Sequence, residues 1–319
     1  MTNKILLTGA AGFIASSTAK LLLDNDFEVI GIDHLNDYYD VGLKEYRLAK
    51  LKKLNGFQFV QLDIENRSGL DQFFRNHNFS AVINLAARAG VRYSIDNPYV
   101  YYSTNVLGTL NILECMKENK VRKLVTASTS SLYSGLEMPF EESMPVSTQI
   151  SPYGASKKAA EVLCYTYHKL YQIDVSILRY FTVYGPAGRP DMSVLRFIKC
   201  IDEGRPIEIY GDGTQARDFT YISDIAEGTL KSLKPLDYEI INLGGGQEPT
   251  TVLDLIEIIE EKLSKKAIVN HLPFHAADMK GTWANIEKAN KHLAWTPKVL
   301  LEDGIQKTID WYNEYKAKL

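Results

Sequence analysis

Four Tyr-x-x-x-Lys patterns occur in the sequence, and each could form an acid–base pair. A lysine four residues after a tyrosine shares its helix face, where the ammonium can stabilise a phenolate. That help is needed because only about one tyrosine in a thousand is ionised at pH 7. The spacing alone does not select the working pair. The four pairs are Tyr46 with Lys50, Tyr153 with Lys157, Tyr165 with Lys169, and Tyr312 with Lys316.

Small residues near the amino terminus could hold the diphosphate of a dinucleotide. In "KILLTGAAGFIASSTAKLL", Gly9 permits a tight strand-to-helix turn, and Gly12 lets the backbone approach an anion. Ala15 is a third small residue and allows close packing of the helix on the strand. Asp33 ends the next strand, where a carboxylate accepts hydrogen bonds from a ribose 2′-hydroxyl and repels a 2′-phosphate. This arrangement favours NAD over NADP.

These residues belong to short apolar runs that alternate with longer helical runs. The apolar runs are nearly continuous, as expected for strands covered on both faces. A βαβ series of this kind predicts an α/β fold with a doubly wound parallel (Rossmann) sheet. The predicted strands are residues 4–8, 28–33, 57–63, 81–86, 123–128 and 175–180.

The composition and the predicted elements change after about Tyr184, where glycine, proline and short strands become frequent before helices return. We predict an NAD-binding domain over residues 1–184, which carries the catalytic pair. Residues 185–319 are predicted to form a smaller, mixed α/β region that binds the substrate. The absence of an obvious linker predicts an interleaved boundary with an extended interface.

Composition excludes several other classes of protein. The 319 residues carry a formal net charge of −3, which offers no basic surface for nucleic acid. No apolar run approaches the ~18 residues that span a bilayer, and the first residues do not form a signal peptide. Three separated cysteines and six scattered histidines form no metal or disulfide pattern. A cytoplasmic protein without a metal is expected, with no membrane or nucleic-acid partner.

Taken together, these motifs resemble the extended short-chain dehydrogenase/reductase family. Within it the chain is similar to the NAD-dependent nucleotide-sugar epimerases, and most closely to those that act on UDP-glucuronate. The resemblance covers essentially the whole chain, and the second and sixth motifs below are the most specific. The motifs are "TGAAGFIA" (8–15), "GIDHLNDYYDVGLKEYRL" (31–48), "NLAARAGVRYSIDNP" (84–98), "ASTSSLY" (127–133), "YGASK" (153–157), "RYFTVYGPAGRPDM" (179–192) and "GDGTQARDFTYISDIAEG" (211–228).

The resemblance selects one tyrosine. In this family a catalytic strand delivers a serine or threonine about two dozen residues before the Tyr-x-x-x-Lys helix. Thr129 ends such a strand and precedes Tyr153 by 24 residues, whereas the other three pairs lie in polar helical runs. Tyr153 is therefore the expected acid–base residue, and Lys157 is expected to lower its pKa and hold the nicotinamide ribose. Thr129 is expected to bind the reacting oxygen of the substrate.

The same resemblance implies further cofactor contacts. Asp63 and Ile64, after the third strand, look like the contact with adenine. The complete set of cofactor-binding residues implied in this way is Gly9, Gly12, Phe13, Ile14, Asp33, Asp63, Ile64, Leu85, Ala86, Ala87, Tyr153, Lys157 and Tyr180.

The family pattern also bears on the sugar. Dehydratases carry an Asp-Glu pair, and decarboxylases a glutamate, where this chain has Ser130 and Ser131. Thr182 in "RYFT" replaces the asparagine that is typical of UDP-glucose epimerases. These hydroxyls, with Arg88 as a candidate cation, could surround a carboxylate. The resemblance thus implies C4 epimerisation of UDP-glucuronate to UDP-galacturonate through a 4-keto intermediate. For Arg88, pairing with a local acid or with the cofactor is the alternative.

The resemblance assigns three further residues to the UDP part of the substrate. Arg217 looks like the diphosphate-binding arginine, and Arg189 lies on a loop expected near the sugar and diphosphate. For Arg189 a structural salt bridge is the alternative. Asp278 is similar to an aspartate near the uridine ribose. A homodimer is also implied, through helices near residues 97–118 and 153–170.

Two alternatives and three departures remain open at this point. The chain could be a UDP-glucose or UDP-N-acetylhexosamine 4-epimerase, or a non-catalytic NAD-binding sensor, although sensors usually lose the tyrosine or the lysine. Ala15 replaces a common third glycine, Ser134 replaces the glycine after the catalytic strand, and Arg88 replaces a common glutamine.

Overall fold

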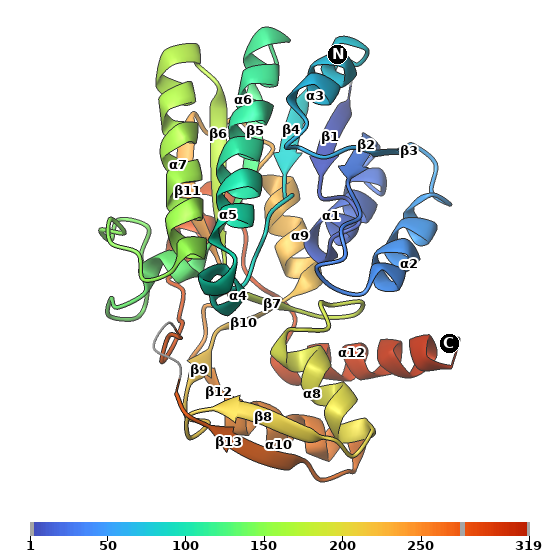
Figure 1. The fold of residues 1–319 in the computed structure, drawn as a ribbon, viewed down its shortest axis with the longest axis vertical. Coiled ribbons are helices and arrows are strands. Elements are labelled where there is room, and N and C mark those ends of the chain that lie inside the picture. The colour runs from blue at the N-terminus through green and yellow to red at the C-terminus, as the bar shows by residue number, and fades with distance from the viewer. Residues whose placement is uncertain (1–2, 275–277, 318–319) are drawn as a thin grey trace.

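The computed structural model describes residues 3–274 and 278–317 (Figure 1). The strands are β1 (Lys4–Thr8), β2 (Glu28–Asp33), β3 (Phe57–Gln61), β4 (Ala81–Asn84), β5 (Lys123–Thr129), β6 (Asp174–Tyr180), β7 (Thr182–Tyr184), β8 (Pro206–Tyr210), β9 (Ala216–Arg217), β10 (Phe219–Tyr221), β11 (Tyr238–Leu243), β12 (Thr250–Thr251) and β13 (Ile268–Leu272). The α-helices are α1 (Phe13–Leu23), α2 (Val41–Leu51), α3 (Arg67–Arg75), α4 (Val91–Asp96), α5 (Pro98–Tyr101), α6 (Thr109–Glu118), α7 (Pro152–Tyr171), α8 (Ser193–Asp202), α9 (Ile222–Lys231), α10 (Val252–Leu263), α11 (Glu287–Leu293) and α12 (Leu301–Lys316). A π-helical stretch, η1 (Tyr102–Gly108), leads into α6, and a 3-10 turn, η2 (Ser130–Tyr133), follows β5.

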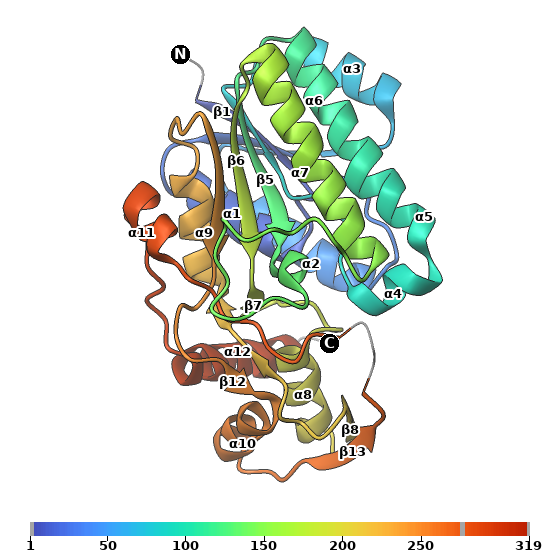
Figure 2. The ribbon, with the colours of Figure 1, turned by 90° about the vertical axis from the view of Figure 1, so that its left-hand side faces the viewer.

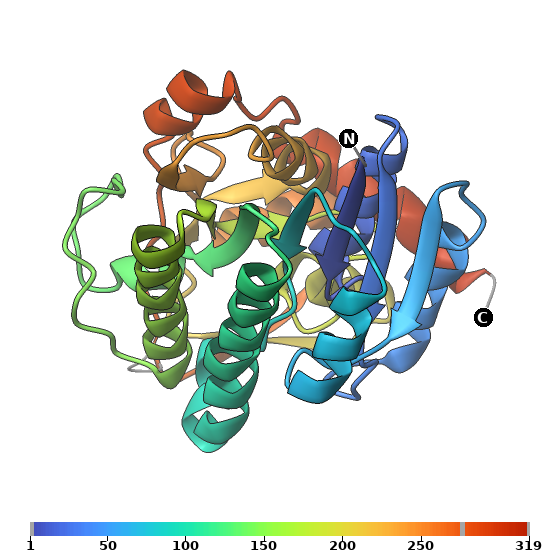
Figure 3. The same ribbon diagram turned by 90° about the horizontal axis from the view of Figure 1, so that it is seen from above.

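Seven parallel strands form the central sheet, in the order β11-β6-β5-β4-β1-β2-β3. Helices α3, α6 and α7 cover one face, and α1 and α9 lie on the other (Figures 2 and 3). Each face has its own cluster of buried aliphatic and aromatic side chains. This arrangement confirms the predicted doubly wound parallel sheet. The strand order reverses between β1 and β4, which is where such sheets bind their ligands.

Two predicted strands end earlier than their apolar runs suggest. The third stops at Gln61 rather than 63, and the fourth at Asn84 rather than 86. The residues that follow them leave the ladder and line a pocket at the carboxyl edge of the sheet. Their apolar character therefore reflects a lining role rather than strand pairing.

Residues after Tyr184 build a second layer below this edge, but part of that chain returns to the sheet (Figure 1). Strand β11 pairs in parallel with β6, and α9 packs against α1. The pairs β8–β13 and β9–β12, with α8, α10 and α12, make the lower region. The division at residue 184 stays a prediction, because the chain crosses between the two regions more than once.

Candidate active site

Helix α7 presents the candidate catalytic pair to the carboxyl end of β5. The Ser151 side chain caps the helix by accepting from the Gly154 N–H, and Pro152 occupies the first turn, where its missing N–H has no cost. Tyr153 and Lys157 then lie one turn apart, and both are buried. Together with Thr129 at the end of β5, they occupy one end of the sheet.

The surroundings of Tyr153 act on its pKa in opposite directions. Burial raises the pKa of the phenol, while the Thr129 hydroxyl and the Arg189 guanidinium lower it, and the net shift is upward. The Lys157 ammonium donates to the Ala127 carbonyl oxygen at 2.7 Å, and burial lowers the Lys157 pKa to about 8. The protein alone therefore holds Tyr153 protonated at neutral pH. Making it a base requires further positive charge near the phenol.

In the other three Tyr-x-x-x-Lys pairs, the tyrosine either ties two helices together or lies at the surface. Trp311 Nε1 donates to the Tyr46 hydroxyl at 2.9 Å, which ties α12 to α2. The Tyr312 hydroxyl donates to Asp202 at 3.2 Å and ties α12 to α8. Tyr165 lies on the outer surface of α7 with 47% of its area exposed. These contacts support the choice of Tyr153.

The glycine loop between β1 and α1 leaves no room for larger side chains. Gly9 has φ +69°, and a Cβ atom there would lie 2.9 Å from the Ala86 backbone. A Cβ atom at Gly12 would lie 2.8 Å from the Gly9 carbonyl oxygen. Gly12 also caps α1, so the first N–H groups of that helix face the pocket edge. The loop has the geometry of a diphosphate cradle.

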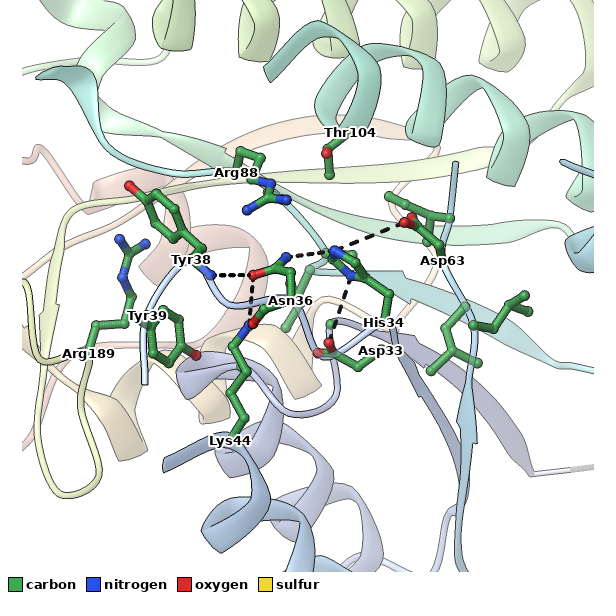
Figure 4. A pocket seen from close by; sticks show the side chains of 18 residues that line it. Asp33, His34, Asn36, Tyr38, Tyr39, Lys44, Asp63, Arg88, Thr104 and Arg189 are labelled. Carbon is green, nitrogen blue, oxygen red and sulfur yellow. Dashed lines mark hydrogen bonds and ion pairs between the residues drawn. The ribbon is translucent and has the colours of Figure 1, made fainter. Parts of the chain in front are cut away.

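A pocket opens beside this loop at the reversal of strand order (Figure 4). Asp33 is held there by two backbone donors, with the Ala11 N–H at 3.1 Å from Oδ2 and the Leu35 N–H at 2.8 Å from Oδ1. Each carboxylate oxygen keeps a further lone pair for a ribose hydroxyl. Most of the predicted cofactor residues meet in this pocket. Its predicted lining residues are Gly9, Gly12, Asp33, Asp63, Ile64, Leu85, Ala86 and Ala87.

Three basic side chains, Lys44, Arg88 and Arg189, line the same pocket, and Lys44 had no predicted role. Lys44 Nζ donates to the Asn36 backbone and side-chain oxygens at 2.5 and 2.9 Å. Burial lowers the pKa of Lys44 against the pull of Asp33, and three nearby arginines lower it further. Such a concentration of positive charge suits the diphosphate of NAD.

Arg88 lines this cofactor pocket, whereas its first predicted role was to bind the carboxylate of the sugar. Its backbone N–H donates to Asn105 Oδ1 at 2.8 Å, and its Nε is buried without a partner among the described residues. An unpaired buried donor favours an anionic ligand. The position favours the alternative in which Arg88 contacts the cofactor.

Three other predicted residues lie at the rim or outside this pocket. Phe13 lines a smaller hollow together with Thr182 and Arg189, and Ile14 follows it on the first turn of α1. The Tyr180 hydroxyl points into the core, where it shares a hydrogen bond of 2.8 Å with Thr229. A contact between the Tyr180 backbone and the cofactor stays a prediction.

The hydroxyls predicted to hold the sugar carboxylate share the edge that carries Thr129. Ser130 and Ser131 begin the η2 turn, and the Ser131 N–H donates to Thr129 Oγ1 at 3.1 Å. Thr129 pairs in register with Tyr180, so Thr182 lies just beyond the end of the neighbouring strand. The fold therefore brings these hydroxyls to one edge.

A second basic group lies between α4 and the lower region, and sequence reasoning missed one of its members. The Arg92 guanidinium donates to the Asp278 carboxylate and stacks on Tyr210, with its central carbon 3.6 Å from the ring centre. Arg217 lies close enough to feel the charges of both Asp278 and Arg92, and burial lowers its pKa. Arg92 stands in the quoted motif "NLAARAGVRYSIDNP", and its position there was the available signal.

Arg189 lies on the loop of residues 185–192, hereafter the Arg189 loop. Its guanidinium forms an ion pair with Asp191 at 2.5 Å, as the alternative of a structural salt bridge predicted. Its guanidinium carbon also lies 5.4 Å from the ring centre of Tyr38, and its charge lowers the Tyr153 pKa. The loop therefore lies close to both the cofactor pocket and Tyr153, the candidate acid–base residue.

With this geometry in view, the family is clear. Residues 5–244 match the NAD dependent epimerase/dehydratase family, and the chain belongs to that family. The glycine loop, the Asp33 carboxylate and the buried Tyr-x-x-x-Lys pair all lie within the matched region.

More narrowly, the chain is similar to epimerases of UDP-sugars. UDP-glucuronate 4-epimerase of Thermodesulfobacterium geofontis is 57% identical over 97% of this chain and 96% of its own. The crystal structure of UDP-glucuronic acid 4-epimerase from Bacillus cereus with UDP-glucuronic acid and NAD has a TM-score of 0.92 and 40% identity, covering 98% of this chain and 99% of that one. UDP-glucose 4-epimerase of Thermotoga maritima with UDP-glucose has a TM-score of 0.89 and 29% identity over the same shares. The predicted family resemblance is confirmed.

Proposed function

We propose that this chain catalyses the NAD-dependent interconversion of UDP-glucuronate and UDP-galacturonate. The observation that carries the proposal is the group of hydroxyls at the substrate edge. Ser130 and Ser131 follow Thr129 directly, at positions where dehydration or decarboxylation would need acidic side chains, and Thr182 follows the neighbouring strand at the same edge. The similarity to UDP-glucuronate 4-epimerases supports the same activity.

In the proposed reaction, Tyr153 removes the proton of the sugar C4 hydroxyl and later returns it. When bound, NAD accepts the C4 hydrogen with its electron pair and gives it back to the opposite face of the sugar. Thr129 would bind the reacting oxygen, and Lys157 would hold the nicotinamide ribose. Burial alone raises the Tyr153 pKa, so the positive charge of the oxidised cofactor must provide much of the opposing stabilisation.

The sugar carboxylate creates a risk of decarboxylation. The 4-keto intermediate of a uronate is a β-keto acid, which loses carbon dioxide when the carboxylate bond aligns with the carbonyl π system. Hydrogen bonds from Ser131 and Thr182 would hold the carboxylate away from that alignment. Each such bond to a charged group contributes about 1.5–3 kcal/mol, enough to change the product ratio tenfold or more.

At the other end of the substrate, Arg217 and Arg92 are proposed to bind the diphosphate. Both approach the same place from different regions of the fold, and the Arg92 Nε is buried without a hydrogen-bond partner among the described residues. Asp278 would orient Arg92 and contact the uridine ribose. The nucleotide is inferred to be UDP from the relatives.

A homodimer is also proposed, through one face of the molecule. Helices α5 and α7 and the stretch η1 leave large apolar side chains exposed on that face. They include Tyr99 (87% exposed), Leu170 (66%), Val162 (54%) and Leu107 (48%). These elements pack against one another, and exposed apolar side chains grouped in this way mark an interaction site. No helix within residues 3–274 and 278–317 is long and apolar enough to span a membrane, and a cytoplasmic location stays a prediction.

The test is incubation of the purified protein with UDP-glucuronate and, separately, with UDP-glucose, followed by mass spectrometry of separated products. We expect UDP-galacturonate with little UDP-pentose from the first substrate. Thr182→Ala and Ser131→Ala should raise the pentose fraction or leave reduced nicotinamide behind. Pentose as the main wild-type product would mean a decarboxylase, and turnover of UDP-glucose alone would mean a neutral-sugar epimerase. NAD binding without any turnover would indicate a sensor.

A further inference from the structure

Arg47 is a buried arginine of α2 that makes its contacts with oxygen atoms of three other segments. Only 3% of it is exposed. Its guanidinium donates to the Ala11 carbonyl at 3.0 Å, to the Tyr39 hydroxyl at 2.7 Å and to the Gly188 carbonyl at 3.2 Å. Nε and one terminal nitrogen both donate to the Ala187 carbonyl, at 3.0 and 2.7 Å. All five N–H···O contacts are therefore directed at backbone carbonyls or a hydroxyl.

The three segments that Arg47 joins all border the cofactor or the sugar. Ala11 belongs to the glycine loop, and its N–H donates to Asp33, so both of its peptide groups are held. Tyr39 belongs to residues 34–40, hereafter the cover segment, which lines the cofactor pocket. Ala187 and Gly188 belong to the Arg189 loop.

A second set of contacts joins the cover segment to the Arg189 loop and to the chain after β4. The Arg189 guanidinium carbon lies 5.4 and 5.8 Å from the ring centres of Tyr38 and Tyr39. The Tyr38 hydroxyl donates to the Ala89 carbonyl at 2.8 Å, which ties the cover segment to the chain after β4. Figure 4 shows Tyr38, Tyr39 and Arg189 together along one side of the pocket. The cover segment thus contacts both Arg47 and Arg189.

Ala187 explains why the Arg189 loop needs this support. It has φ +55°, a left-handed conformation that is unfavourable for a residue with a side chain. Its carbonyl accepts two of the five Arg47 hydrogen bonds. Without Arg47, this partly buried carbonyl and the buried one of Ala11 would lose charged donors, and the strained turn could relax.

We infer that Arg47 is a positioning residue that keeps the cofactor pocket closed during the reaction by fastening the cover segment and the Arg189 loop to the glycine loop. The inference rests on the proposed function, because epimerisation succeeds only if the ketone and the reduced cofactor stay together until the hydrogen returns. Arg47 itself contacts neither reacting atoms nor catalytic side chains. It acts through the placement of Asp33, Tyr39 and Arg189.

The test compares Arg47→Ala, Arg47→Lys and Tyr39→Phe with the wild-type protein. Arg122→Ala is the control, because Arg122 also donates to a backbone carbonyl, that of Tyr171, but at the amino ends of the strands. The measurements are the NAD dissociation rate, the dependence of turnover on added NAD, and the fraction of turnovers that end in free ketone and reduced nicotinamide. A melting temperature accompanies each variant.

For Arg47→Ala we expect NAD to dissociate about tenfold faster or more, because several hydrogen bonds from a charged donor are lost. Turnover should then require added NAD, and abortive release should rise. Arg47→Lys should have an NAD dissociation rate between those of Arg47→Ala and the wild-type protein, since a lysine keeps the charge but cannot reach all three segments. Tyr39→Phe should give a smaller change in the same direction, and Arg122→Ala should leave NAD dissociation unchanged.

A folded Arg47→Ala protein with the wild-type NAD dissociation rate and no abortive release would overturn the inference, whatever its melting temperature. If Arg47→Ala does not fold, Tyr39→Phe decides: faster NAD loss supports the inference, and the wild-type rate refutes it. The proposed function is judged separately. Wild-type protein that binds NAD but does not turn over UDP-glucuronate would refute that function, while the NAD dissociation rates would still test Arg47.

Discussion

At the scale of single residues, the proposed chemistry depends on a tyrosine whose environment works against ionisation. Burial raises the Tyr153 pKa, and the Lys157 ammonium is directed at the Ala127 carbonyl rather than at the phenol. Lys157 was expected to lower the Tyr153 pKa. Among the described residues, however, its hydrogen bond goes to Ala127 and not to the phenol. Tyr153 should become a base chiefly when the positively charged cofactor is in place.

The first prediction separates this tyrosine from its neighbours. Tyr153→Phe should reduce turnover by about 10²–10⁴-fold, because it removes the general acid–base group. NAD content should be preserved, since the glycine loop and Asp33 are untouched. Turnover with UDP-glucuronate and absorbance of the released cofactor measure the two effects.

Tyr165→Phe is the matched control on the same helix. Its ring lies 5.1 Å from that of Tyr238 at the protein surface, and its side chain is half exposed. We expect nearly wild-type turnover. Equal losses in the two variants would show that the wrong pair has been chosen.

At the scale of elements, one buried carboxylate joins the lower region to the edge of the sheet. Asp218, between β9 and β10, is 2% exposed. It accepts from the Ala284 N–H at 2.9 Å, the Gly246 N–H at 3.3 Å and the Gly245 N–H. These donors come from the turn after β11 and from the segment before α11. Because Arg217 precedes it directly, Asp218 also fixes the strand that carries the proposed diphosphate ligand.

Asp218→Asn should destabilise the protein by about 1–3 kcal/mol, because the amide turns a donor toward backbone N–H groups and leaves one of them unpaired. Denaturant unfolding measures this free energy. Asp212→Asn serves as the control at an exposed turn, where we expect a change within about 0.5 kcal/mol. A stability of Asp218→Asn equal to that of the control would contradict the role given to Asp218.

At the scale of the whole molecule, the distribution of exposed apolar side chains indicates how copies would associate. Val162 on α7 and Ile268 on β13 are similarly exposed, at 54% and 52%, but they lie in different regions of the molecule. Only Val162 belongs to the apolar face formed with α5 and η1. The comparison therefore separates a specific interface from general surface hydrophobicity.

Val162→Arg should convert a dimer to a monomer, because a charged side chain would be buried without a partner at the interface. Ile268→Arg should leave the dimer intact. Sedimentation or light scattering at several concentrations measures the mass. A wild-type protein that is monomeric throughout the range, or a Val162→Arg variant that stays dimeric, would exclude this face as the interface.

Local patterns in the sequence determined the central features of this protein. Continuous apolar runs predicted the parallel sheet, and the spacing of Gly9, Gly12 and Asp33 predicted the cofactor cradle. The family resemblance, together with Thr129 at the end of a strand, singled out Tyr153. The cradle residues lie within one βαβ unit, where the order of the chain constrains the order in space.

Tertiary structure alone decided the contacts between distant segments. Residues 238–243 read as part of the second region, yet they complete the central sheet, because strand pairing over long separations leaves no local periodicity. Arg92 reaches Asp278 across 186 residues, and Arg47 reaches Gly188 across 141. Long, flexible cations can be placed only when the acceptors they meet are known, so their roles emerge from packing and not from the sequence pattern.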